Sequence, residues 1–210
     1  MKILGFDPSL TNFGWVLIEI ENKNINLIKS GRIQTKNDID FIDRYIFIRQ
    51  ALIEIIKESN PDFIGCEYPI FKDIFSEGMY GLFLYTNEAI KLNNKSVVYF
   101  SPGQVKAVAK DYLGRPKSWK MQKLDMVEAC SSKSGIKKIN HNEADAFWVA
   151  YLAGRFWQLY NEEINESELD IFEFNMFCKI HVFTKGKKKG QTKKIGIIHR
   201  EDERFFLWGQ

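Results

Sequence analysis

The chain has 210 residues with a hydrophobic fraction of 45% that includes 17 Phe, enough for one domain with a core and a small appendage. No apolar run reaches the roughly 18 residues that cross a bilayer, and the N-terminus lacks a signal peptide, so we expect neither a membrane protein nor an exported one. The net charge of +3 is weak evidence about partners, and three scattered cysteines suit a reducing cytosol and argue against a zinc cluster.

The first third of the chain predicts a sheet that opens with antiparallel strands. Residues 2–6, 14–20 and 25–35 form three β-type runs, and their short connections predict hairpins. Apolar residues recur with a helical period over 39–58. A short and almost wholly apolar strand follows at 63–67, and it ends in a carboxylate.

Helices dominate the part of the chain that follows. The pattern predicts helices over 73–92, 102–112, 118–130 and 142–160, with one further strand at 96–100. Three hairpin strands, followed by helices that alternate with two more strands, predict an α/β domain. Its centre is a mixed five-stranded sheet flanked by helices.

The composition changes near residue 160, so we expect a domain over 1–160 and an extension over 161–210. Within the extension, the runs 180–183 and 195–198 flank a basic, glycine-containing connection and predict a C-terminal β-hairpin. An acidic linker precedes this hairpin.

The connection of the predicted hairpin is rich in lysine. Such a cluster can be a solvated loop, or it can contact the phosphate backbone of a nucleic acid. The hairpin can also serve as a dimer or partner element, and the sequence leaves these alternatives open. The lysines are Lys185, Lys187, Lys188, Lys189, Lys193 and Lys194.

Three carboxylates stand in comparable positions. Asp7 and Glu67 each end a strand, and Asp145 lies near the start of the long last helix. Clustered carboxylates raise one another's pKa unless a cation neutralises them, and oxygen ligands suit Mg²⁺ or Mn²⁺. Two such ions about 4 Å apart can activate water and stabilise the leaving oxygen of a phosphodiester. A simpler interpretation of Asp7, as a residue that favours a turn, remains open.

Four stretches occur in an order and spacing that resemble a known family. They are Gly5–Trp15 (GFDPSLTNFGW), Glu67 with Phe71, Ser101–Lys106 (SPGQVK) with Lys117, and His141–Ala146 (HNEADA). Together they resemble the motifs of RuvC-type Holliday-junction resolvases, which belong to the RNase H-like nuclease superfamily. The resemblance covers residues 1 to about 156.

The resemblance implies that Asp7, Glu67 and Asp145 are the catalytic residues, that they hold two Mg²⁺ ions, for which Mn²⁺ can substitute, and that they position the attacking water. The family has a fourth ligand three residues before the last aspartate, and here that position is Asn142, a weaker and neutral ligand. His141, one residue earlier, shares the same helix face. His141 can be a metal ligand, or a structural cap or surface residue.

The resemblance also implies contacts with DNA. Lys106 and Lys117 match positions that approach the scissile phosphates, with Lys120 close by, although Lys106 and Lys117 can also be plain surface lysines. Phe71 can stack on unpaired bases or belong to the core. Outside the resemblance, the hairpin lysines Lys187, Lys188 and Lys189 can add a grip on the DNA backbone.

We therefore expect a metal-dependent endonuclease that cuts Holliday junctions or related branched DNA such as forks or flaps. It would act as a homodimer, because two symmetric cuts need two active sites, in the cytoplasm, or in the host's cytoplasm if a phage encodes it. One alternative is a DNA-binding protein of the same fold with weak or no cleavage. Another is an ATPase of the actin and sugar-kinase fold, but the chain lacks a second domain and a second glycine-rich phosphate loop.

Overall fold

The computed structural model describes residues 1–21, 24–69 and 76–194. The chain forms two compact units, and the division between them lies between Gly154 and Arg155. The domain boundary itself, expected at residue 160, stays a prediction. Among the helices of the described residues, none combines the length and apolar character needed to cross a bilayer.

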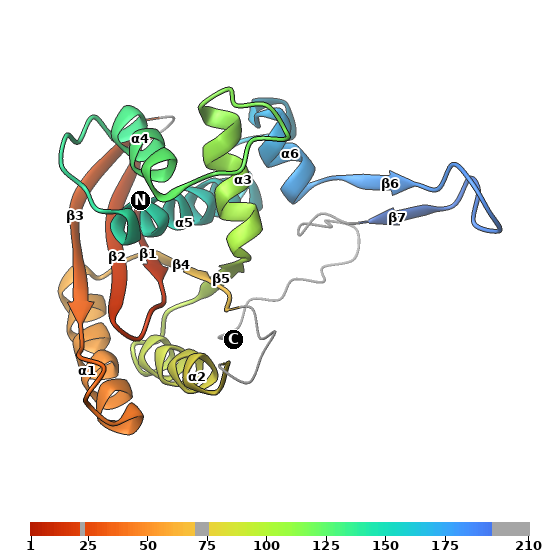
Figure 1. The fold of residues 1–210 in the computed structure, drawn as a ribbon. Helices are drawn as coiled ribbons and strands as arrows, with labels where there is room; N and C mark the ends of the chain where they lie inside the picture. The colour runs from red at the N-terminus through yellow and green to blue at the C-terminus, as the bar shows by residue number, and fades with distance from the viewer. Residues whose placement is uncertain (22–23, 70–75, 195–210) are drawn as a thin grey trace. The chain divides into compact units, whose positions relative to one another are not determined.

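The first unit is built on a mixed five-stranded sheet with the strand order β3-β2-β1-β4-β5 (Figure 1). The pairs β1–β2 and β2–β3 are antiparallel, whereas β1–β4 and β4–β5 are parallel. The predicted α/β fold with a mixed sheet is therefore confirmed. The strands are β1 (Lys2–Asp7), β2 (Asn12–Glu21), β3 (Asn24–Gln34), β4 (Phe63–Glu67) and β5 (Val97–Phe100).

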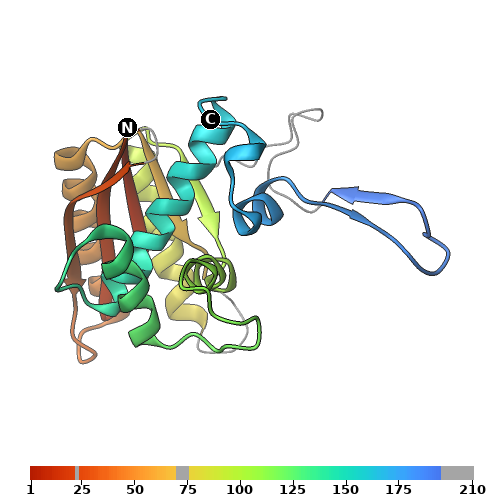
Figure 2. The same cartoon turned by 90° about the horizontal axis from the view of Figure 1, so that it is seen from above.

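Helices cover both faces of this sheet (Figures 1 and 2). The helices α1 (Phe41–Ser59) and α2 (Ser76–Leu92) pack together on one face. On the other side lie α5 (His141–Tyr160), which crosses the sheet, and the pair α3 (Pro102–Tyr112) and α4 (Lys123–Ser134).

The start of α4 differs from the prediction. The helix begins at Lys123 rather than at residue 118, because Gln122 and Asp125 form a capping box there. The Asp125 carboxylate accepts from the Gln122 amide at 2.7 Å and from the Trp119 indole at 3.2 Å. Residues 119–122 are consequently an irregular loop whose shape is fixed at its helical end.

The close approach of α5 to the sheet decides where the acidic side chains point. A Cβ added to Gly5 would stand 2.2 Å from the Ala146 carbonyl oxygen, and one added to Gly65 would stand 2.7 Å from an alanine methyl of the same helix. Both glycines therefore face α5. Because side chains alternate between the faces of a sheet, Asp7 and Glu67, two residues further along each strand, also project towards the α5 side.

The second unit contains the end of α5, a single 3₁₀ turn η1 (Glu166–Glu168), the helix α6 (Ile171–Phe177) and a two-stranded sheet. In that sheet β6 (Ile180–Val182) pairs antiparallel with β7 (Thr192–Lys194), which confirms a hairpin.

Two details of this unit differ from the predictions. The prediction of an acidic linker was wrong in part, because this stretch contains the helix α6. Asp170 caps the start of α6 and forms a capping box with Glu173. The strand that pairs with β6 lies within the predicted loop, and the predicted run 195–198 lies outside the described residues.

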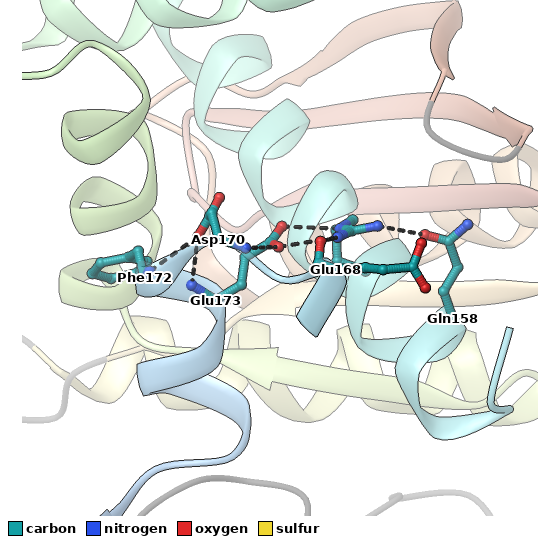
Figure 3. A network of polar contacts seen from close by, with 6 residues as sticks. Gln158, Glu168, Asp170, Phe172 and Glu173 are labelled. Atoms are coloured by element: carbon teal, nitrogen blue, oxygen red, sulfur yellow. Dashed lines mark hydrogen bonds and ion pairs between the residues drawn. The ribbon is translucent and has the colours of Figure 1, made fainter. Parts of the chain in front are cut away.

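A buried ion pair organises the helical part of the second unit (Figure 3). Arg155 donates to both carboxylate oxygens of Glu173, at 3.0 and 3.2 Å, and these residues are 8% and 1% exposed. Arg155 also donates to the Gln158 side chain at 3.2 Å and to the Glu168 carbonyl at 2.9 Å. One guanidinium thus ties the last turns of α5 to η1 and α6.

Candidate active site

The two central parallel strands end side by side with a carboxylate each. In the register of β1 and β4, Phe6 lies opposite Cys66, so Asp7 and Glu67 are the next residues on neighbouring strands. Neighbouring strands lie about 4.8 Å apart. Since both side chains project from the same face, their carboxylates share one edge of the sheet.

The third carboxylate, Asp145, comes from α5. Asn140 fixes the start of this helix, because its side-chain oxygen accepts from the amides of Asn142 at 2.9 Å and Glu143 at 3.2 Å, and Glu143 accepts from the Asn140 amide in return. The cap is therefore Asn140 rather than His141. With the neighbouring Ala146 packed on the first strand, Asp145 is held on the same side of the sheet as the two strand carboxylates.

The three acidic groups influence one another electrostatically. Burial, and then the charges of Glu67 and Asp145, raise the pKa of Asp7 well above its ordinary value. Burial and then Asp145 raise the pKa of Glu67 to about 7, and burial raises the pKa of Asp145 to about 6. Lys106 opposes all three of these shifts. Ionising all three carboxyl groups at once therefore costs free energy in the folded protein.

These residues fit a divalent cation. One carboxylate oxygen of Asp145 is buried without a hydrogen-bond partner, and such an atom is costly unless a cation or a donor meets it. Within the described residues, no three His, Cys, Asp or Glu side chains are already gathered closely enough to enclose an ion. The three carboxylates thus lie at the same edge of the sheet and affect one another's pKa. To bind an ion together, their side chains would have to move closer to one another.

The two residues expected near a fourth ligand position have other contacts. The Asn142 side chain donates to the Asn12 carbonyl at 2.8 Å and so ties α5 to the start of β2. The imidazole of His141 lies 3.2 Å from the Lys123 ammonium, and burial, Lys123 and Arg32 lower the pKa of His141. As ligands, both remain proposals.

Lys123 is a residue that the sequence analysis missed. Its charge lowers the pKa of Asp7 and of Asp145, as the charge of Lys106 also does. It is the first residue of α4, and the acidic Asp125 in the first turn of this helix is the signal that could have placed the helix start there. Among the described lysines, Lys106 and Lys123 supply the positive charge that acts on the carboxylates, whereas Lys117 is exposed and contributes none of these shifts.

A basic pocket begins at Lys106. It has a volume of about 250 Å³, and three lysines and an indole line it: Lys106, Lys110, Lys120 and Trp119. The Arg115 guanidinium lies 5.1 Å from the centre of the Trp119 ring. Lys106 and Lys120 had been predicted to bind DNA, whereas Lys110 and Trp119 had not. A partly buried lysine in the last turn of α3 and an exposed aromatic residue in a loop give no periodic signal of a binding site.

For four of the predicted DNA-binding residues, the position relative to this site stays a prediction. Phe71 lies outside the described residues. Lys187, Lys188 and Lys189 belong to the second unit, in the loop between β6 and β7.

The mixed sheet, with carboxylates at the ends of two central parallel strands and a third on the helix that crosses them, defines an RNase H-like nuclease fold. A family model described as crossover junction endodeoxyribonuclease RuvC matches residues 3–151. The chain therefore belongs to the RuvC family of crossover junction endodeoxyribonucleases. Nucleases of this family are metal-dependent and typically dimeric.

Named relatives agree with this assignment. The chain is 33% identical to crossover junction endodeoxyribonuclease RuvC of Prochlorococcus marinus, over 71% of this chain and 94% of that protein. It is 29% identical to the corresponding protein of Halothermothrix orenii, over 76% of this chain and 95% of the relative. The family model ends at residue 151, before the hairpin, so the hairpin lies outside the part that the model matches.

Solved structures show the same fold. T. thermophilus RuvC in complex with Holliday junction substrate superimposes with a TM-score of 0.60 at 18% identity, over 71% of this chain and 90% of that one. The Thermus thermophilus RuvC structure gives a TM-score of 0.60 at 19% identity, over 71% and 91%.

Proposed function

We propose that this chain is an endonuclease that cleaves Holliday junctions with two Mg²⁺ ions per active site. The observation that carries the proposal is the convergence of Asp7, Glu67 and Asp145 on one side of the sheet, with raised pKa values and an unpartnered buried oxygen. Family membership favours this reading over the ATPase alternative.

The three carboxylates would hold the ions, with Mn²⁺ as a substitute, and Asn142 or His141 would complete the set of ligands. Bound divalent ions supply activation of water and stabilisation of the leaving oxygen in phosphodiester hydrolysis. The protein contributes a rigid edge: two ligands stand on paired strands, and the third stands on a helix packed directly on one of them. Side chains on regular elements hold such geometry better than side chains on loops.

The lysines around the site would receive the DNA. Lys106 and Lys123 act on the carboxylates, and from Lys106 the basic pocket continues to Lys110 and Lys120. Ammonium groups in a row bind successive phosphates of a strand. Trp119, which is 43% exposed, offers a face on which an unpaired base can stack. Lys117 and Phe71 remain proposed DNA contacts on the strength of the resemblance.

A homodimer would match the substrate. A four-way junction has two symmetry-related strands to cut, and a two-fold symmetric dimer presents two sites in the corresponding arrangement. Forks and flaps remain candidate substrates beside the junction. We propose the cytoplasm as the place of action, because three widely scattered cysteines with no paired spacing fit a reducing compartment.

The proposal is tested with a synthetic four-way junction, a fork and a linear duplex, each incubated with Mg²⁺ or with chelator. We expect paired, symmetric nicks in the junction with Mg²⁺ and none in chelator. Asp7→Asn should abolish nicking and retain junction binding, because it removes a ligand and leaves the basic pocket intact.

Two outcomes would contradict the proposal. Full nicking by Asp7→Asn would show that the carboxylate site is not catalytic. Tight junction binding without nicking by the wild-type protein would instead support the alternative of a structure-specific DNA-binding protein. That alternative draws its support from Asn142, which is neutral and already donates to the Asn12 carbonyl.

A further inference from the structure

The hairpin of the second unit concentrates the positive charge of the whole chain. Residues 179–194 contain seven lysines and no acidic residue. Because the net charge of the complete chain is +3, all other residues together carry a net charge of −4. That negative balance comes mainly from the acidic stretch 161–178, because residues 1–160 carry a net charge of +3. The family domain therefore contributes a weak general attraction to a polyanion, and the hairpin adds the densest positive charge of the chain.

The loop that carries these lysines has a defined backbone. Gly190 donates to the Phe183 carbonyl at 2.8 Å, and Phe183 donates to the Gln191 carbonyl at 3.0 Å, which closes the loop at its base. Further out, the Lys189 amide donates to the Gly186 carbonyl at 3.1 Å. Gly186 and Gly190 have φ values of 75° and 83°, a region that favours glycine. The loop is thus a series of turns that holds Lys187, Lys188 and Lys189 exposed.

The two strands below the loop are also open to solvent. Ile180 and Val182 are 53% and 50% exposed, and His181, between them, packs edge-on against Phe183 with ring centres 4.9 Å apart. A two-stranded ribbon without a packed face is only marginally stable in water. Such a ribbon gains stability by lying against a further surface.

The size and charge of this ribbon fit duplex DNA. The major groove of B-form DNA is about 12 Å wide and admits a two-stranded β-ribbon, and the exposed lysines would meet the phosphates on either side. We propose that the β6–β7 hairpin is a second DNA-binding element, which holds a duplex arm of the substrate through its phosphate backbone without reading sequence. The choice of DNA as the partner rests on the proposed function.

The test measures the salt dependence of binding. In an Asp7→Asn background, which separates binding from cleavage, Lys187→Gln, Lys188→Gln and Lys189→Gln are combined. Each lost phosphate contact lowers the slope of log K against log salt by about 0.9, so the three together should lower it by about 2.7. Between 50 and 200 mM salt the parent should therefore lose about 40-fold more affinity than the variant.

A matched control changes the same number of charges elsewhere. Lys57, Lys91 and Lys95 lie near the ends of α1 and α2 and before β5, at the opposite edge of the sheet from Glu67. Their combined change to Gln should leave the slope unchanged. Because the hairpin grips duplex rather than the branch point, its three lysines should contribute equally to binding of a junction and of a linear duplex.

Several results would overturn the inference. Equal slopes for the hairpin variant and its parent would do so, and so would a changed molecular mass in solution, which would make the hairpin a dimer element. A larger effect on duplex RNA than on DNA would also contradict it, because the A-form major groove is too narrow for a ribbon. If the wild-type protein does not nick junctions but the slopes differ as expected, the proposed function fails and the hairpin assignment stands.

Discussion

The raised pKa of Glu67 predicts that a metal ligand destabilises the protein when no metal is bound. Burial and the charge of Asp145 raise this pKa from an ordinary 4.5 to about 7. At about 1.4 kcal/mol for each pKa unit, keeping Glu67 ionised in the fold costs about 3 kcal/mol at pH 8. Since Asp145 shares this effect and the site reaches the surface, we expect Glu67→Gln to stabilise the metal-free protein by about 2 kcal/mol.

The sign follows from proton linkage. A carboxyl group whose pKa is higher in the folded than in the unfolded state carries no penalty below about pH 4.5, an increasing penalty between pH 4.5 and 7, and the full penalty above. The difference in free energy of unfolding between Glu67→Gln and wild type should therefore be near zero at pH 4 and largest at pH 8.

Thermal unfolding in chelator at both pH values measures this difference. A gain of about 2 kcal/mol corresponds to a rise in melting temperature of roughly 4–8 °C for a chain of this size. Glu54→Gln, on an exposed position of α1, is the matched control and should change little. Added Mg²⁺ should stabilise the wild type more than the variant, since ligands that bind only the folded state raise its stability. A variant no more stable than wild type at pH 8 in chelator would refute the reasoning.

Three further changes test other parts of the structure. Asp145→Asn should reduce junction nicking to background and leave junction binding in chelator intact; nicking at the wild-type rate would contradict this. Lys123→Met should lower the stability of the metal-free protein at pH 8 by a few tenths to about 1 kcal/mol, an effect opposite in sign to that of Glu67→Gln. An unchanged free energy of unfolding would show that the Lys123 charge does not act on the carboxylates. Arg155→Met removes the positive charge beside the buried Glu173 carboxylate, so hydrogen exchange in residues 155–178 should report a loss of about 3–5 kcal/mol. The double change Arg155→Met with Glu173→Leu should recover most of this loss, whereas equal exchange in all three proteins would show that the pair stabilises nothing.

Much of the carboxylate edge could be predicted from sequence, because local rules decide it. Asp7 and Glu67 each end a short apolar strand, and the side-chain alternation of a strand fixes their face once the neighbouring glycines meet α5. The small residues of α5 indicated close packing, and this packing carries Asp145 to the strands.

The positions of the lysines around the carboxylates were harder to predict, because exposed lysines show no periodic pattern along the sequence. Lys123 owes its position to the capping box at Gln122, which was overlooked, and the helix was placed five residues too early. Lys110 comes close to Lys120 only because the loop 119–122 folds back between α3 and α4. The helix α6 was hidden in an acidic stretch, although its Asp170-x-x-Glu173 pattern is a recognisable helix start.

Binding of Mn²⁺ to the protein is the most direct test of the central claim, that three carboxylates form one site for divalent ions. Titration in the presence of a four-way junction, followed by electron paramagnetic resonance, counts the ions bound to each chain. We expect two ions per chain for wild type and for Glu54→Gln, and loss of this binding when Asp7, Glu67 and Asp145 are changed together to Asn, Gln and Asn. Binding of the same number of ions, with the same affinity, by the triple variant would contradict the account.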